Sequence, residues 1–205
     1  MTKTLTLSAT ALAAVLVLAG CSTGSGSNTM PGGMDHSTMA GAPAPTSTGP
    51  AAGNVDHNGS DAMFAQAMVP HHAQAVEMSD AILKKPGMDA RVTVLATKIK
   101  AAQAPEIERM SGWLAGWDEP TEVPGGHSMT GMMSGEDLSK LEAAQGVEAA
   151  RLFLGQMIAH HEGAVEMANA EVRSGKNVEA IQLGKDIAAS QKGEIQEMKD
   201  LLAEL

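Results

Sequence analysis

The chain carries two copies of a histidine pair flanked by methionines. Each copy reads Met-x-x-His-His-x5-Met, the first from Met68 to Met78 and the second from Met157 to Met167. Neutral imidazole and thioether groups are soft ligands, which suit Cu(I) better than magnesium, calcium or a carboxylate-bound di-iron centre. We therefore expect a copper ion as the ligand. The candidate metal ligands are Met68, His71, His72, Met78, Met110, Met157, His160, His161, Met167 and Met198.

The spacing around each pair predicts a helix. Steps of three and four residues place side chains on one face at about 100° per residue. His71 falls near the middle of this face, and His72 falls about 100° away, on its flank. The apolar stripe of the first copy comprises Phe64, Met68, His71, Ala75, Met78 and Ile82.

A second duplicated motif defines the architecture. The pattern Ile-x-x-x-Gln-x-x-Glu-Ile-x-x-Met begins at Ile99 and returns at Ile187, 88 residues later, whereas Phe64 returns as Phe153, 89 residues later. The one-residue difference fits in the turn between the two motifs. Each half is therefore predicted as helix, turn, helix, and two such hairpins bury their apolar faces in an all-α four-helix bundle.

Capping signals and composition divide the chain further. Ser60-Asp61 and Ser134, with Asp137 three residues on, are predicted helix starts. The segment 118–133, rich in Gly, Pro and Met, is predicted to cross between the halves. The predicted parts are a signal peptide at 1–20, a flexible tether at 21–57 and the bundle domain at 58–205, with halves at about 58–117 and 134–205.

The second motif places polar side chains on the inner side of the helix that faces each histidine pair. A carboxylate or amide there could accept a hydrogen bond from the ring nitrogen that a metal does not use. A structural alternative stays open, because methionine often fills gaps in cores and a buried His–Glu layer can fix bundle register. The residues in question are Gln103, Glu106, Gln191 and Glu194.

Methionine and histidine also lie together where no core is predicted. Gly33-Met-Asp-His-Ser-Thr-Met39 in the tether resembles the Met-Asp-His-Ser repeats of exported copper-resistance proteins, which implies capture of copper ions. The crossover carries a similar cluster, and core packing does not account for either. The candidate capture residues are Met34, His36, Met39, His127, Met129, Met132 and Met133.

The first residues read as an export signal. Lys3 precedes an uncharged apolar run that ends in Leu18-Ala19-Gly20-Cys21, which resembles a bacterial lipobox. Cys21 is the only cysteine, so an intramolecular disulfide is excluded. We expect lipidation of Cys21 and an extracytoplasmic, membrane-anchored protein, because two acyl chains suffice for stable anchoring.

The charge and composition argue against one class of partner. The formal net charge is −10, with two Trp, two Phe and no Tyr. A phosphate backbone needs a basic surface and single strands need aromatic platforms, so nucleic acid is excluded as a partner.

The duplicated Met-x-x-His-His-x-x-Ala-Val-x-Met, followed by Gln-x-x-Glu-Ile-x-x-Met, resembles the bacterial family named domain of unknown function 305 over residues 61–205. The resemblance implies a ferritin-like bundle, export and, for some members, copper binding or tolerance. Our leading hypothesis is a non-enzymatic, lipid-anchored copper-binding protein that could pass the ion to an envelope protein. The alternative is a structural or interaction module with a polar His/Glu core and no metal.

Overall fold

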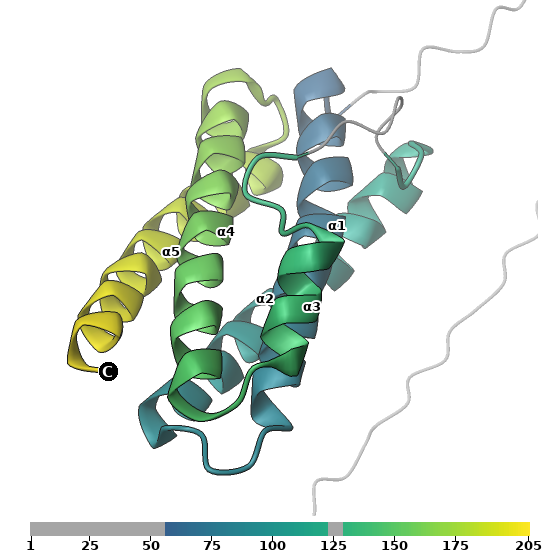
Figure 1. The fold of residues 1–205 in the computed structure, drawn as a ribbon. Helices are drawn as coiled ribbons and strands as arrows, with labels where there is room; N and C mark the ends of the chain where they lie inside the picture. The colour runs from purple at the N-terminus through teal and green to yellow at the C-terminus, as the bar shows by residue number, and fades with distance from the viewer. Residues whose placement is uncertain (1–55, 123–128) are drawn as a thin grey trace, which may run out of the picture. The chain divides into compact units, whose positions relative to one another are not determined.

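The computed structural model describes residues 56–122 and 129–205, and within these ranges the regular elements are five helices. Helices α1 (Gly59–Leu83) and α2 (Ala90–Trp117) form the first hairpin. A short α3 (Gly135–Ala143) precedes the second hairpin, α4 (Gly146–Ser174) and α5 (Val178–Glu204) (Figure 1). The all-α bundle of two duplicated hairpins is thus confirmed. The predicted signal peptide and the tether up to residue 55, with Cys21, Met34, His36 and Met39, lie outside the described residues, as does His127. The predicted end of the tether at residue 57 is wrong, because His57 is buried and stacks on Trp117 of the bundle.

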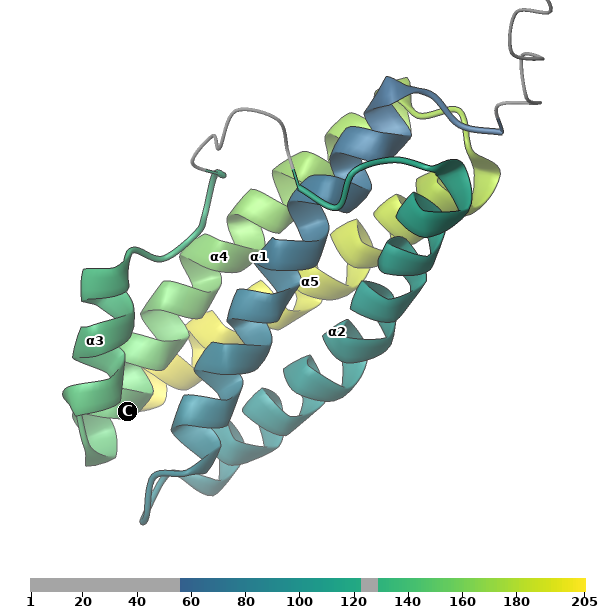
Figure 2. The same cartoon turned by 90° about the vertical axis from the view of Figure 1, so that its right-hand side faces the viewer.

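The two hairpins meet through the helices that carry the histidine pairs. α1 packs mainly against α2, and α4 packs mainly against α5. Between the halves, α1 and α4 form the larger contact and run in opposite directions, whereas α2 and α5 contact each other little (Figures 1 and 2). The first and second copies of the histidine motif therefore face each other across the interface between the halves.

The third predicted helix is interrupted shortly after its start. Ser134 caps α3 and exchanges hydrogen bonds with Asp137, as the capping-box spacing predicts. The chain leaves the helix at Ala144 and re-enters one at Gly146, whose φ of 55° lies in the left-handed region. Lys85 donates hydrogen bonds to the carbonyls of Glu142 and Ala144, at 2.7 and 2.8 Å, so the freed carbonyls at the end of α3 find partners. Periodicity alone could not locate this break.

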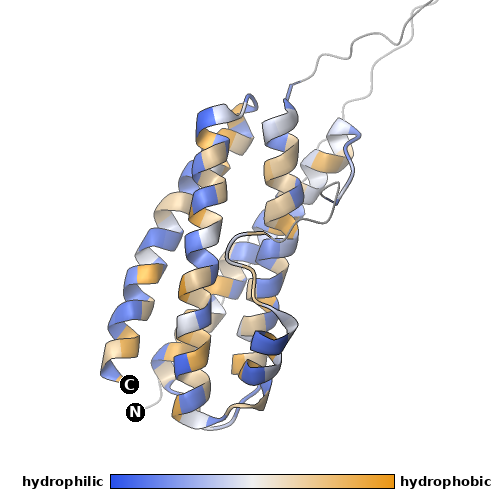
Figure 3. Cartoon of the chain, turned by 45° about the horizontal axis from the view of Figure 1, so that its top comes forward, coloured by the Kyte–Doolittle hydropathy of each residue, from blue (hydrophilic) through white to orange (hydrophobic). Residues whose placement is uncertain are grey.

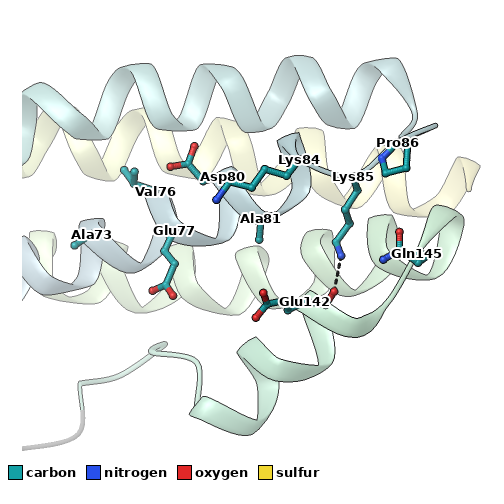
Figure 4. Close-up of a pocket in the computed structure, with 10 residues that line it drawn as sticks. All are labelled: Ala73, Val76, Glu77, Asp80, Ala81, Lys84, Lys85, Pro86, Glu142 and Gln145. Carbon is teal, nitrogen blue, oxygen red and sulfur yellow. Dashed lines mark hydrogen bonds between the residues drawn. The ribbon is translucent and has the colours of Figure 1, made fainter.

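A groove lies beside this break, between α1 and the end of α3 (Figure 4). Its lining includes Glu77, Asp80 and Glu142 but no histidine or methionine. Lys100 donates a hydrogen bond of 2.6 Å to Asp80. The groove is therefore separate in chemistry and place from the histidine pairs.

The start of α1 differs from the prediction. Asn58, not Ser60 or Asp61, is the N-cap, and its side chain accepts hydrogen bonds from the amides of both those residues. Asp61 completes the capping box by accepting from the Asn58 amide at 2.6 Å. The predicted start lies too late in the sequence, because Asp61 is the third residue of the helix and not its N-cap. It also accepts hydrogen bonds from the amides of Lys176 and Asn177, and so joins α1 to the turn between α4 and α5.

The core consists of two hydrophobic clusters, one toward each end of the bundle. The helices are amphipathic, and apolar and polar residues alternate along them (Figure 3). Within the described ranges, no helix has the length and apolar character needed to cross a membrane.

Asp61 forms a buried pair with Glu171 of α4, whose side chain also accepts a hydrogen bond from Ser60 at 3.4 Å. Burial and the hydrogen bond with Asp61 raise the pKa of Glu171 to about 8. Burial opposes ionisation of Asp61 too, but hydrogen bonds from Glu171 and from backbone amides lower its pKa overall. The pair therefore holds one proton, carried by Glu171, near neutral pH.

This pair predicts that stability falls in alkaline solution. The contribution of a carboxyl group with a raised pKa is complete below its ordinary pKa of 4.5 and is lost as the pH rises through about 8. We expect the free energy of unfolding, measured in urea, to fall between pH 5 and pH 9 by on the order of 2 kcal/mol. Glu171→Gln should remove most of this dependence, whereas Glu166→Gln, an exposed position on the same helix, should retain it. An equal pH dependence in both variants would contradict the shared proton.

Candidate metal centre

His71 of α1 and His160 of α4 meet at the interface between the hairpins. Their ring centroids are 3.7 Å apart, and the ring planes are tilted by 39°. Both side chains are essentially inaccessible to solvent. The helical stripe thus predicted the burial of these two residues correctly, and the antiparallel crossing of α1 and α4 brings them into contact.

Neither nitrogen of either ring has a hydrogen-bond partner in the protein. Burial lowers the pKa of His71 to about 3, and the neighbouring His72 contributes to this shift. Burial also lowers the pKa of His160 to about 2, with further contributions from the other histidines. Both rings are therefore neutral at ordinary pH, so each offers a nitrogen lone pair to a ligand.

His72 and His161 are fully buried, although the helical wheel places His72 on the flank of the stripe and not at its middle. Helices α2 and α5 cover this flank and supply a carboxylate to each ring. The Nε2 atom of His72 lies 2.8 Å from Glu106, and that of His161 lies 2.9 Å from Glu194. We assign the ring proton to Nε2, because the carboxylate accepts it. The Nδ1 atoms have no protein partner and are free to bind a ligand.

The two glutamates therefore occupy the inner side of the partner helix, as their spacing predicts, and each bonds the second histidine of its pair. The neighbouring glutamines are also buried. Neither polar atom of the Gln103 side chain has a partner, and Oε1 of Gln191 has none. Such unpartnered groups are rare in protein cores and call for an explanation.

The candidate methionines divide between the two hydrophobic clusters. Met68 and Met110 belong to one cluster, against which Met167 packs in a partly buried position. Met78, Met157 and Met198 belong to the other. Because α1 and α4 run antiparallel, each cluster receives methionines from both hairpins, and the histidines lie between the clusters. We call His71, His72, His160 and His161 the histidine layer. Thioether groups thus flank this layer along the bundle axis.

The crossover methionines behave differently from the prediction in one respect. Met129, Met132 and Met133 are all partly buried, and Met133 packs against a core cluster. Core packing does therefore account for Met133. Gln74, which the sequence motifs did not single out, is buried on α1 and hydrogen-bonds both backbone groups of Met133. Its place beside the apolar stripe, three residues after His71, was the available signal.

Within the described ranges, no three His, Cys, Asp or Glu side chains form a group that could hold a metal. A metal at the histidine layer would therefore be held by two imidazole nitrogens, alone or together with thioether sulfur or a glutamine oxygen. This donor set excludes hard cations, which prefer several carboxylates, and favours soft monovalent ions.

A family model agrees with the duplicated motifs. The model described as domain of unknown function (DUF305) matches residues 61–202. The chain belongs to this family. A search of curated proteins finds no match.

Solved structures of DUF305 proteins share the fold. A protein from Streptomyces coelicolor, described as a candidate secreted protein, is 36% identical, with a TM-score of 0.68 over 71% of this chain and 93% of its own. A DUF305 fragment from Deinococcus radiodurans is 31% identical, with a TM-score of 0.66 over 72% of this chain and 98% of its own. CopM in its Cu(I)-bound form is 31% identical, with a TM-score of 0.60 over 70% of this chain and 96% of its own. CopM also has Cu(II)-bound and Ag-bound structures.

The unpartnered rings predict that the histidine layer costs stability in the metal-free protein. A buried polar group without a partner costs about 1 to 3 kcal/mol, and an apolar residue of similar size avoids this cost. We expect His71→Leu to raise the free energy of unfolding of the metal-free protein in urea. His57→Leu is the matched control and should lower it, because His57 stacks on Trp117 and contacts Glu119. A loss of stability in His71→Leu would mean that the imidazole has a structural role.

Proposed function

We propose that this protein binds copper as cargo, in the monovalent state, at the histidine layer between its two hairpins. The observation that carries the proposal is the set of buried imidazole nitrogens of His71 and His160 that have no protein partner. Several unsatisfied polar atoms in one layer lower the stability of the fold, and a bound ion would supply these atoms with the partner they lack. The low pKa of both rings also means that no proton has to leave them on binding.

The surrounding residues support a soft ion in this place. Met68, Met110, Met157 and Met198 are fully buried next to the histidine layer, and thioethers prefer Cu(I). The hydrogen bonds from Glu106 and Glu194 would orient His72 and His161 with Nδ1 available, as carboxylates do around other metal-bound histidines. The Cu- and Ag-bound structures of CopM, which is about as similar as the family members in sequence, support the same class of ion.

We further propose that the protein works outside the cytoplasm and is anchored through a lipid on Cys21. The Leu18-Ala19-Gly20-Cys21 ending supports this, and so does the likeness to a candidate secreted protein. The capture residues Met34, His36 and Met39 of the tether would raise the local concentration of copper near the bundle. The protein would then store the ion or pass it to an envelope acceptor, without catalysis.

The alternative is a purely structural module, and the His72–Glu106 and His161–Glu194 hydrogen bonds favour it, since they join the two helices of each hairpin. In that case metal would leave the stability unchanged. A ligand specific to the folded state at 100 times its dissociation constant adds about 2.7 kcal/mol. Thermal unfolding with and without Ag(I) therefore separates the two functions.

The direct test is an anaerobic Cu(I) titration of the purified protein against a competing chelator. We expect affinity far tighter than micromolar, and we expect it to weaken by at least about tenfold in His71→Ala and in His160→Ala. His57→Ala, which removes a histidine remote from the layer, should bind as the unmodified protein does. Micromolar or weaker binding that is the same in all variants would overturn the proposal.

The methionines can be tested without disturbing the fold. Met→Leu exchanges conserve volume and cost less than about 1.5 kcal/mol of stability. Met68→Leu and Met157→Leu should therefore leave the urea midpoint nearly unchanged but weaken Ag(I) binding. Met88→Leu, at a partly buried position packed against the cluster that contains Met157, should change neither. Unchanged Ag(I) affinity in the first two variants would assign these methionines to packing alone.

A further inference from the structure

One non-helical segment covers the histidine layer. Residues 129–133, here called the strap, lead into α3 and pass between α1 and α4 (Figure 1). A turn forms within the strap, where the Met132 amide donates to the Met129 carbonyl at 3.2 Å. The strap therefore bridges the two helices that carry His71 and His160.

The strap contacts α4 backbone to backbone. A Cβ atom on Gly163 would lie 2.1 Å from the Thr130 carbonyl oxygen, which is closer than any real contact allows. On the strap side, Gly131 has a φ of 85°, and a Cβ there would lie 3.0 Å from the carbonyl oxygen of His160. This fit requires glycine at both positions, and it places the strap against the turn of α4 that carries His160.

The strap is held to α1 by a single side chain. Gln74 donates to the Met133 carbonyl at 3.0 Å and accepts from the Met133 amide at 2.7 Å. Gln74 lies one helical turn beyond His71. The backbone of Thr130 also lies close to His71. Both attachments thus stand beside the pair of facing rings.

The two attachment positions correspond to each other in the duplication. Gly163 lies 89 residues after Gln74, which is the offset that relates His160 to His71. The flanking residues of the two copies agree closely, since Ala75-Val76-Glu77-Met78 matches Ala164-Val165-Glu166-Met167. At position 74 the first copy has a side chain that bonds the strap, and at the matching position 163 the second copy has none, which leaves room for the strap. The divergence therefore matches the needs of the strap.

We propose that the strap is the gate through which ions reach the histidine layer, and that Gln74 and Gly163 are the positioning residues that hold it closed. The inference rests on the proposed function, because it supposes that an ion reaches His71 and His160. These rings have no solvent exposure, so part of their cover must move. The other covering elements are helices of 25 to 29 residues with their own hydrogen-bond ladders. The strap is fixed to α1 by the two bonds of Gln74, so it opens at the lowest cost.

The first experiment measures access without any metal. Diethyl pyrocarbonate acylates neutral imidazole nitrogens, and mass spectrometry of peptides gives the rate at each histidine. We expect Gln74→Ala and Gly163→Ala to raise the rates at His71 and His160 by about tenfold, since two hydrogen bonds or the close backbone fit are lost. The rate at His57, remote from the strap, should not change and reports any general unfolding.

Matched controls exist for both variants. Gly155→Ala places a Cβ in open space on the same helix α4, so it isolates the effect of the clash at Gly163. Gln156→Ala removes a side-chain hydrogen bond of 2.9 Å to the Asp137 carbonyl, away from the strap. Both controls should acylate at the rates of the unmodified protein.

The second experiment measures Ag(I) binding and release in stopped flow, with a chelator to start release. A gate predicts that association and dissociation accelerate by the same factor in Gln74→Ala, while the dissociation constant stays the same. Faster dissociation alone would overturn the gate and make the strap part of the binding site. Rates of acylation and Ag(I) exchange equal to those of the controls would place the route elsewhere. Failure of the unmodified protein to bind Ag(I) would instead reject the proposed function, and the acylation rates would still test the strap.

Discussion

His71 and His160 meet ring to ring at 3.7 Å where α1 crosses α4, with no protein partner for any of their four nitrogens. The rest of the domain is arranged around this contact. Each half supplies one ring, so the contact forms only when both hairpins are folded and docked. The desolvation of the rings opposes docking, and the methionine-containing clusters on either side must offset it by burying apolar surface. Folding therefore buries a layer of imidazole rings in which most ring nitrogens lack a hydrogen-bond partner in the protein.

The main contribution of the outer helices, α2 and α5, is to orient histidines of this layer. α2 and α5 hardly touch each other, yet each contributes a carboxylate to the second histidine of the pair in its own hairpin. The first histidine of each pair is left unbonded and the second is oriented. Two adjacent residues of the same type thus have different environments, because one points at the other hairpin and one points at its own. This division is the physical basis for assigning ion binding to the layer as a whole.

Much of this arrangement could be predicted from the sequence, because helical periodicity and duplication are local signals. They predicted the hairpins, the central place of His71 and His160 and the inward position of Glu106 and Glu194. They predicted the flank position of His72 but not its complete burial, since a helical wheel has no information about which neighbour covers that flank. The break at Ala144 was missed for a similar reason: Lys85, distant in sequence, stabilises the interrupted end. The anchor prediction and the tether prediction up to residue 55 rest on residues outside the described ranges.

The difference between Gln74 and Gly163 has a consequence for how such a domain can arise. A dimer of one hairpin could reproduce the four long helices and the ring contact, because both are compatible with two-fold symmetry. It could not hold the strap, since its two copies would carry the same residue at this position, either two amides or two glycines. Joining the hairpins in one chain freed the two copies to diverge. Covalent linkage of the hairpins thus permits the asymmetry that holds the strap over the histidine layer.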